Sequence, residues 1–465
     1  MSKIAILGAG PGGYSAAFRA ADLGLEVTLI EQSNTLGGTC LNVGCIPSKT
    51  LLHLSQIIDD ANTAEKYGVK FIEPEIDLEK IRAWKDSVVG KLTAGLAMLA
   101  KLRKINIVEG EAKFTSANSI EVTNNDTKQT IEFDQAIIAS GSSTVKLPFL
   151  PEDERIMDST SALALNDIPK NMLIIGGGII GLEMATFYHS LGSEISIVEF
   201  MPQLASGADL DVITPLQKKL QTKCKEIMLE TKVVKAEAKA DGIWVTFEGE
   251  NAPPEPVCYD KLLVAVGRRP NGKLIDADKA GVSIDERGFI PVNDKLQTNV
   301  PNIFAIGDII GNPMLAHKAV HEGRLAAEII NGSDKTNIEQ PIPAVAYTTP
   351  ELAWIGKTEQ QLKENNIAYE KAVCPWMASG RALSMDQSEG FTKLLIEKES
   401  KQLLGAAIVG PNAGDLIAEL ALAITNKLTI EAIAHTIHPH PTLSETNMLA
   451  AELYLKTATD LPNNT

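Results

Sequence analysis

Two stretches of the chain share one order of apolar and polar positions. Each opens with a short apolar run, "IAIL" or "LII", passes through a glycine-rich turn and a helical pattern, and returns to a second apolar run, "VTLIE" or "ISIVE". Short apolar runs bounded by glycine predict buried strands, and the dozen or so residues between them predict a helix. Residues 4–31 and 173–199 are therefore predicted to form two strand–helix–strand units.

Both units carry glycines in the pattern G-x-G-x-x-G and an acidic residue 23 positions after the first glycine. In this motif the first glycine forms a tight turn, the second lets the backbone approach a pyrophosphate, and the third lets helix and strand pack closely, while the acid can bind ribose hydroxyls. One copy is weak evidence, but two copies with equal spacing predict two dinucleotide sites. The residues are Gly8, Gly10, Gly13 and Glu31 in the first unit and Gly176, Gly178, Gly181 and Glu199 in the second.

Three later segments, "FDQAIIASGSS", "DKLLVAVGRRPN" and "NIFAIGDII", each end an apolar strand in a turn of small residues. The third brings Asp308 to a strand end, where it can accept hydrogen bonds from the polyol of a cofactor. From "EQPIPAVAYTTPELAWIG" onward, proline-punctuated strands are followed by helical patterns. We predict an α/β protein with two Rossmann-like dinucleotide-binding domains and a C-terminal α+β domain. The predicted division is 1–143 and 144–268 for the two dinucleotide domains, 269–340 completing the first, and 341–465 for the last.

Composition and charge narrow the function classes. The residues are 44% hydrophobic and 22% charged, as in ordinary globular proteins. The formal net charge is -16 and the sequence contains no basic stripe, so nucleic acid is not an expected partner. The most apolar run, "MLIIGGGIIGLEMA", is short and contains Glu183, which argues against a membrane span. The few residues before "IAILGAG" leave no room for a secretory signal, and a cytoplasmic location is expected.

The residues after the second acidic position indicate which nucleotide the second unit binds. Because Phe200 to Gln203 contain no arginine that could bind a 2′-phosphate, NAD is favoured over NADP.

The stretch "GGTCLNVGCIPSK" places Cys40 and Cys45 close together. No second cysteine pair exists and His53 is the only nearby histidine, so no metal site is expected. On a straight helix, the Cα atoms of residues five positions apart are separated by about 8–9 Å. A disulfide needs a Cα separation of roughly 4.4–6.8 Å. A bridge between Cys40 and Cys45 therefore requires a distorted backbone, which Gly44 permits. So small a loop would stabilise folding little, which favours a redox pair over a structural staple.

These motifs, together with "VGRRPN", "AIGD" and "HPHPTLSE", resemble those of the pyridine nucleotide-disulfide oxidoreductases over essentially the whole chain. The resemblance is to the branch that oxidises protein-bound dihydrolipoamide to lipoamide through a redox-active disulfide and FAD, reducing NAD+ to NADH. It implies FAD in the first unit, NAD in the second, and a homodimer formed by the C-terminal domain. The partners it implies are the lipoylated acyltransferase core of 2-oxoacid dehydrogenase complexes or the lipoyl carrier protein of the glycine cleavage system.

By this resemblance, Cys40 is attacked by the substrate, Cys45 lies against the flavin as a thiolate, and Lys49 approaches the flavin and pairs with Glu183. The pattern H-P-T-L-x-E selects His440 as general acid and base, with Glu445 orienting it, and the family places His440 across the dimer interface from the cysteines. His438 is interpreted as structural. The FAD contacts further include Glu31, Gly38, Thr39, Cys40, Lys49, Ala112, Asp308, Met314, Ala316 and His317. The NAD contacts further include Glu199, Val233, Gly267 and Arg268.

Two alternatives remain open at this stage. One is another disulfide reductase of the family, similar to glutathione reductase, although those enzymes typically carry arginines after the second strand and a tyrosine in place of Ile179. The other is a mainly structural flavoprotein subunit, against which the intact set of Cys40, Cys45, His440 and Glu445 argues.

Overall fold

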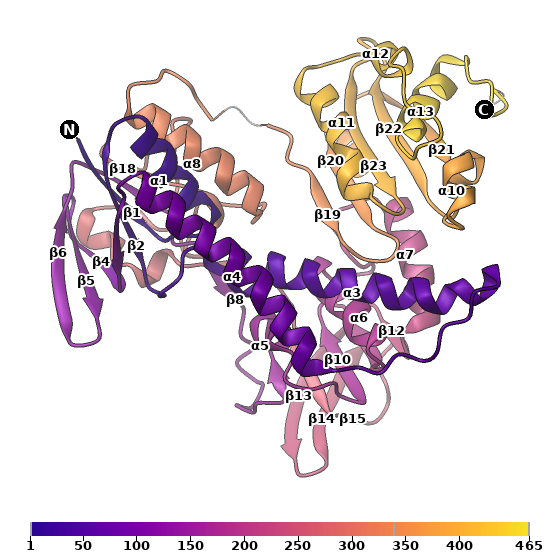
Figure 1. Ribbon diagram of the computed structural model, residues 1–465, viewed down its shortest axis with the longest axis horizontal. Coiled ribbons are helices and arrows are strands. Elements are labelled where there is room, and N and C mark those ends of the chain that lie inside the picture. Colours follow the sequence, from indigo (N-terminus) through magenta and orange to yellow (C-terminus); the bar gives the residue numbers. More distant parts are fainter. Residues whose placement is uncertain (1, 338–339, 464–465) are drawn as a thin grey trace.

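The computed structural model describes residues 2–337 and 340–463, and these residues form three large sheets with their helices (Figure 1). None of the helices in these two ranges combines the length and the apolar composition needed to cross a membrane.

The first sheet is parallel, with strand order β18-β7-β1-β2-β3. Helices α1 and α8 pack side by side against it, although they are far apart in the sequence (Figure 1). An antiparallel sheet, β4-β5-β6, extends from its edge. The bounds are β1 (Lys3–Leu7), α1 (Pro11–Asp22), β2 (Glu26–Glu31), β3 (Asn106–Glu109), β4 (Glu111–Ser116), β5 (Ser119–Asn124), β6 (Thr127–Glu132), β7 (Gln135–Ile138), β18 (Ile303–Ala305) and α8 (Ala316–Ile330).

The second sheet is also parallel, with order β12-β11-β10-β16-β9, and it carries an antiparallel sheet, β13-β14-β15. Helix α6 is apolar on nearly every side, since it packs against α3 and β19 as well as against its own sheet. The bounds are β9 (Ile156–Met157), α5 (Ser159–Ala164), β10 (Asn171–Ile175), α6 (Ile179–Ser190), β11 (Glu194–Val198), α7 (Leu210–Lys223), β12 (Glu226–Met228), β13 (Thr231–Lys239), β14 (Gly242–Gly249), β15 (Val257–Tyr259) and β16 (Lys261–Val264).

A two-stranded ribbon of β8 (Ser142–Thr144) and β17 (Arg268–Pro270) connects the two parallel sheets. The two predicted strand–helix–strand units are thus confirmed, and their first strands have the continuous burial typical of parallel sheets covered on both faces.

The third sheet is antiparallel, with order β19-β20-β23-β22-β21, as expected for the C-terminal α+β part. Its bounds are β19 (Ala344–Ala346), β20 (Leu352–Gly356), α9 (Glu359–Glu364), β21 (Tyr369–Pro375), α10 (Gly380–Ser384), β22 (Phe391–Glu397), β23 (Leu403–Val409), α11 (Ala413–Thr425), α12 (Ile430–Ala434) and α13 (Glu445–Leu455). Short 3-10 segments are η1 (Ala64–Tyr67), η2 (Gly272–Leu274), η3 (Ala277–Ala280), η4 (Gly307–Ile309) and η5 (Trp376–Ala378).

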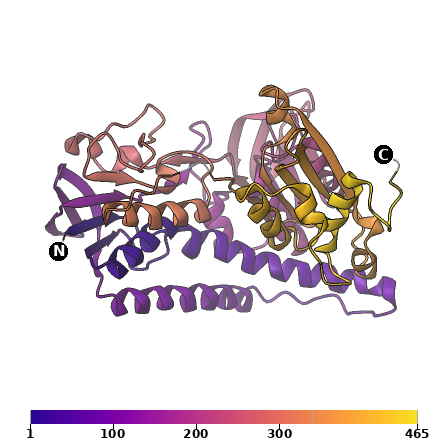
Figure 2. The same ribbon diagram turned by 90° about the horizontal axis from the view of Figure 1, so that it is seen from above.

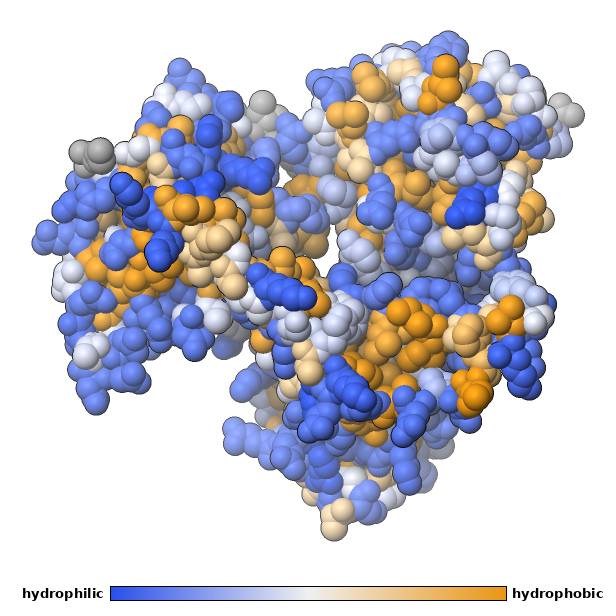
Figure 3. All heavy atoms as spheres, in the orientation of Figure 1, coloured by the Kyte–Doolittle hydropathy of each residue, from blue (hydrophilic) through white to orange (hydrophobic). Residues whose placement is uncertain are grey.

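Between the sheets run α2 (Gly38–Val43), α3 (Cys45–Thr63) and α4 (Leu78–Leu102), and Figure 2 shows α3 and α4 as long neighbouring helices. Large apolar side chains are exposed on α4 and on the segment before it, among them Phe71, Ile72, Met98 and Leu102. On the face drawn in Figure 3, apolar residues form patches between polar ones. Exposed apolar surface of this kind is typical of contact with a partner.

Candidate active site

The first glycine motif needs glycine at its outer positions and leaves space at its middle one. A Cβ on Gly8 would lie 2.4 Å from the carbonyl oxygen of Ala139, and one on Gly13 would lie 1.8 Å from that of Gly8. A Cβ on Gly10 would meet its nearest atom, the Cα of Gly38, at 3.9 Å. The backbone at the middle glycine is therefore accessible, as the approach of a phosphate requires.

The second glycine motif repeats this arrangement. A Cβ on Gly176 would lie 2.5 Å from the carbonyl oxygen of Ala265, and one on Gly181 would lie 2.2 Å from that of Gly176. At Gly178 a Cβ would meet no atom of the described residues within 4 Å.

The acid of each unit is bonded to its own glycine loop. Glu31 Oε2 accepts the backbone N–H of Ala9 at 2.7 Å, and Glu199 Oε2 accepts that of Gly177 at 2.6 Å. Each carboxylate is thus fixed beside the turn that would hold a pyrophosphate, where it can also face a ribose.

A cavity of about 660 Å³ opens over the first glycine motif, within the size range of cofactor sites. The buried hydroxyl of Ser140, in its wall, has no hydrogen-bond partner among the described residues. A buried polar atom usually has a partner, so this hydroxyl fits a polar ligand such as the expected FAD. The predicted residues that line the cavity are Gly8, Gly10, Glu31, Gly38, Thr39, Cys40, Cys45, Lys49, Ala112, Glu183, Asp308, Met314 and Ala316.

Both cysteines line this cavity and are free thiols in this structure. Cys40 lies in α2 and Cys45 is the first residue of α3. The helix is interrupted between them at Gly44, where a Cβ would lie 2.8 Å from the carbonyl oxygen of Thr39. The interruption is the departure from a straight helix that a bridge between these positions requires.

The two thiols have opposite pKa shifts. A hydrogen bond from Cys40 stabilises the thiolate of Cys45 and, with the ammonium of Lys49, lowers the pKa of Cys45 to about 7, although burial and Glu183 oppose the shift. The same hydrogen bond, with burial, raises the pKa of Cys40. Cys45 is therefore the sulfur that ionises first and leaves more readily from a disulfide.

Lys49 and Glu183 form an ion pair at the wall of the cavity. Lys49 Nζ lies 2.9 Å from each carboxylate oxygen of Glu183, whose side chain is 3% exposed. The backbone N–H of Tyr347 also donates to Glu183 Oε1, at 3.2 Å, and the hydroxyl of Ser48 lies 3.5 Å from Oε2. No sequence motif indicates Tyr347, because it is 164 residues from Glu183 and follows β19 in the C-terminal part.

Asp308 is held at the cavity by a residue that the motifs did not indicate. The Ser142 hydroxyl donates to Asp308 Oδ2 at 2.5 Å, and Arg268 Nε donates to the Ser142 hydroxyl at 2.7 Å. Arg268, expected among the NAD contacts, also lines the first cavity. The β8–β17 ribbon brings it there, because it pairs Arg268 with Thr144.

A buried ion pair of α8 supports the turn that carries Asp308. Glu322 Oε2 accepts the N–H of Gly307 at 2.7 Å, and Lys318 Nζ donates to the carbonyl oxygen of Gly307 at 3.2 Å. The two side chains are 3.0 Å apart and almost fully buried. Both polar groups of Gly307 are thereby fixed, yet neither side chain belongs to a sequence motif that we recognised.

His440 lies outside the cavity, in the segment before α13. Its Nδ1 lies 2.9 Å from Glu445 Oε1, and the other oxygen of Glu445 accepts the N–H of Thr442 at 2.7 Å. The imidazole is 80% exposed, so within one chain its outer nitrogen faces solvent. His438 is instead buried, with Nε2 2.8 Å from Glu419 and Nδ1 2.8 Å from the carbonyl oxygen of Thr436, in keeping with the structural interpretation.

Other predicted contacts lie outside the first cavity. His317 Nε2 is 2.9 Å from the carbonyl oxygen of Pro343, and burial lowers its pKa. Val233 is 8% exposed and packs in the apolar core of the second domain. Gly267, in the turn before β17, has a positive φ of 115° and space around its Cα.

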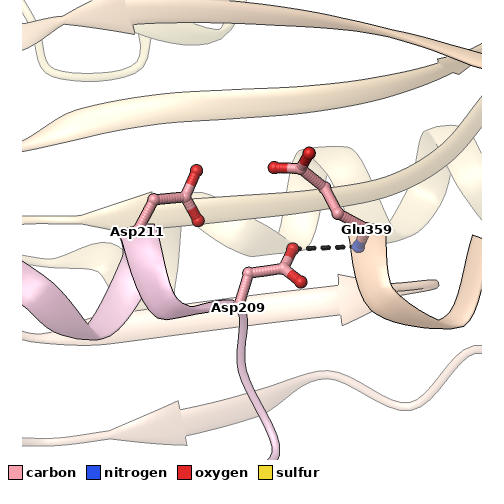
Figure 4. A group of neighbouring side chains, drawn as sticks. All are labelled: Asp209, Asp211 and Glu359. Atoms are coloured by element: carbon pink, nitrogen blue, oxygen red, sulfur yellow. Dashed lines mark hydrogen bonds between the residues drawn. The ribbon is translucent and has the colours of Figure 1, made fainter. Parts of the chain in front are cut away.

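One group of acidic residues could suggest a metal site, namely Asp209, Asp211 and Glu359 (Figure 4). The ammonium of Lys393 lies 2.9, 2.7 and 2.8 Å from their respective carboxylates and is 1% exposed. A cation of the protein itself therefore occupies the position that a metal would take.

Known protein families match nearly the whole chain. The profile described as "Pyridine nucleotide-disulphide oxidoreductase" matches residues 2–323, and its dimerisation domain matches residues 342–451. A protein of Vibrio cholerae named dihydrolipoyl dehydrogenase is 55% identical over 99% of this chain and 97% of its own length. Another protein of that name, from Geobacillus stearothermophilus, is 46% identical over 97% of this chain and 96% of its own length.

Solved structures agree on the fold. LpdA from Mycobacterium tuberculosis superposes with a TM-score of 0.90 at 24% identity, covering 97% of this chain and 99% of that one. The HOCl-induced flavoprotein disulfide reductase RclA from Escherichia coli superposes with a TM-score of 0.86 at 27% identity, with the same coverage.

Proposed function

The chain belongs to the pyridine nucleotide-disulphide oxidoreductase family, and on this premise we propose that it is a dihydrolipoyl dehydrogenase. The observation that carries the proposal is the thiol pair of Cys40 and Cys45 on the wall of a cavity beside a dinucleotide motif. Full-length relatives of that name support the same choice, and no observation favours the glutathione reductase-like or structural alternatives.

In the proposed reaction the oxidised pair, Cys40–Cys45, accepts two electrons from a dithiol. A substrate thiolate attacks the sulfur of Cys40 and expels Cys45 as thiolate, which its lowered pKa favours. The second substrate thiol then attacks the mixed disulfide, forms the substrate disulfide and releases Cys40.

A base is needed to ionise the substrate thiol, and we assign this role to His440. Glu445 fixes Nδ1 of the imidazole and leaves the exposed Nε2 to take the proton. Because His440 faces solvent within one chain, we assign it to the thiol pair of a second subunit, as the dimerisation domain of the family supports.

The family uses FAD and NAD, and the residues present fit both. Bound in the first cavity, FAD would supply the two-electron chemistry that links the thiol pair to hydride transfer to NAD+. Gly10, Glu31 and Asp308 would hold the first dinucleotide, and Gly178 with Glu199 the second. Lys49 holds a positive charge at the cavity wall, anchored by Glu183.

The remaining expectations belong to the proposal. The dithiol substrate is a lipoyl group on an acyltransferase core or on a lipoyl carrier protein, and the location is cytoplasmic. The division into 1–143, 144–268, 269–340 and 341–465 is retained, since β18 and α8 of the third segment pack with the first sheet. Residues 1, 338, 339, 464 and 465 lie outside the described residues.

The test is anaerobic titration of the purified protein with dihydrolipoamide, followed by addition of NAD+. We expect bleaching of the flavin, a long-wavelength band from the Cys45 thiolate, and NADH formation. Cys45→Ser should lose the band and turnover, whereas His440→Gln should keep bound flavin and slow the thiol half-reaction at least a hundredfold. Turnover with glutathione and NADPH alone would contradict the proposal.

A further inference from the structure

Tyr347 belongs to the C-terminal part of the chain, yet it contacts the ion pair at the cavity wall. Lys49 Nζ lies 4.6 Å from the centroid of the Tyr347 ring, within the distance at which an ammonium is attracted to an aromatic face. The backbone N–H of the same residue donates to Glu183 Oε1 at 3.2 Å. One residue therefore contacts both members of the pair.

We propose that Tyr347 is a positioning residue, whose ring holds the ammonium of Lys49 at the cavity wall beside the thiol pair. The inference rests on the proposed function, since it assigns Tyr347 a part in the redox site.

The need for such a contact follows from the exposure of Lys49. Glu183 is fixed by its burial and by the N–H of Tyr347, but the Lys49 side chain is 32% exposed and flexible. The carboxylate alone constrains one side of the ammonium, and the aromatic ring constrains another. Both contacts are needed to keep a long side chain in one rotamer beside solvent.

The position of Lys49 matters because its charge reaches Cys45. Within one chain, the charged or titratable groups that face Cys45 are Cys40 on α2, Lys49 on its own helix and Glu183 on α6. Of these, Lys49 is held by a side chain from the C-terminal part. Loss of the ring should weaken the effect of Lys49 on the thiol, while the backbone contact to Glu183 remains.

The test compares Tyr347→Leu with Tyr347→Phe in the FAD-loaded protein carrying Cys40→Ser, which keeps Cys45 unpaired. The thiolate of Cys45 is titrated with pH through its long-wavelength absorbance against the flavin. We expect Tyr347→Leu to raise the pKa of Cys45 by about half a unit. Tyr347→Phe should leave this pKa at its original value, since phenylalanine keeps the aromatic face. Trp244→Leu, which removes a comparable contact with Lys239 at 4.7 Å, is the matched control and should change nothing.

An unchanged titration in Tyr347→Leu, or an equal shift in Tyr347→Phe, would overturn the inference. The titration needs no lipoyl substrate, so it gives an answer even if dihydrolipoamide is not oxidised. Failure of the proposed function and failure of this inference are thus distinguishable. If Tyr347→Leu lowers the thermal midpoint, the comparison is repeated with Tyr347→Met, for which the same rise is expected.

Discussion

Cys45 ionises near neutral pH because two neighbours stabilise its thiolate. Its pKa of about 7 lies below the ordinary value of 9.0, with the hydrogen bond from Cys40 as the main cause and the Lys49 ammonium as another. The thiolate is accordingly present above pH 7 and is lost as the pH falls through that value.

We predict that Lys49→Met raises the pKa of Cys45 by about one unit, since an opposite charge is removed. Glu183, left without its counter-ion, adds to the rise. The pH titration of the thiolate in the Cys40→Ser background measures the shift. Lys128→Met, at an exposed lysine of β6, is the control, and an unchanged midpoint in Lys49→Met would refute the assigned electrostatics.

At the scale of elements, different glycines of the first motif are needed for folding and for cofactor binding. Gly13→Ala should destabilise the flavin-free protein by several kcal/mol, because its Cβ would lie 1.8 Å from the Gly8 carbonyl oxygen. Gly10→Ala should change that stability by less than about 1 kcal/mol but weaken FAD binding at least tenfold, because its Cβ would occupy open space at the cavity wall where the pyrophosphate is expected. Denaturant unfolding and flavin titration measure the two effects, and equal destabilisation by both variants would contradict this division.

The sequence predicted those elements whose signals are local. The two strand–helix–strand units follow from glycine spacing and apolar runs, and the break between Cys40 and Cys45 follows from Gly44. The contacts of Tyr347 with Glu183 and of Ser142 with Asp308 join residues 164 and 166 positions apart, and no local pattern reports them. The hydrogen bonds of Arg268 to Ser142 likewise depend on which strand β17 pairs with.

At the scale of the molecule, Lys393 joins the second domain to the C-terminal part. Lys393 on β22 contacts Asp209 and Asp211 at the start of α7 and Glu359 at the start of α9. Figure 4 shows these three carboxylates together. Lys393→Met should lower the free energy of unfolding by about 3–5 kcal/mol, because it removes the buried cation and leaves only the partly exposed Lys371 beside the three carboxylates. Lys398→Met, at an exposed lysine after the same strand, is the control for denaturant unfolding, and equal stabilities would contradict the role of Lys393.

The same cluster makes stability depend on acid. Its lysines lower the pKa of Glu359 from 4.5 to about 2, although burial opposes them. A lowered pKa stabilises the folded state above the ordinary value, and this contribution is lost as the pH falls from 4.5 towards 2. Unfolding measured across this range should show a smaller loss of stability in Glu359→Gln than in the wild type.

The assembly can be tested by mixing two inactive chains. Suppose that each thiol pair uses the histidine of the other subunit, and that a dimer combines one Cys45→Ser subunit with one His440→Gln subunit. One of its sites then contains both substitutions, and the other site contains neither. We expect such mixed dimers to show about half the activity of the wild-type dimer, measured by NAD-dependent oxidation of dihydrolipoamide. Were His440 to serve the thiols of its own chain, both sites would be inactive.

Helix α3 begins at the redox thiol, and its later turns contact other parts of the molecule. Its Asp59 pairs with Lys223 at 2.5 Å, and Gln56 accepts a hydrogen bond from Thr349 at 3.3 Å. Each residue of a helix advances about 1.5 Å and turns about 100°. An insertion or deletion within α3 would displace the thiol relative to these anchors, whereas residues 68–77, which follow the helix without regular structure, can change in length. Among homologous chains, length variation should therefore concentrate after α3 and be rare within it.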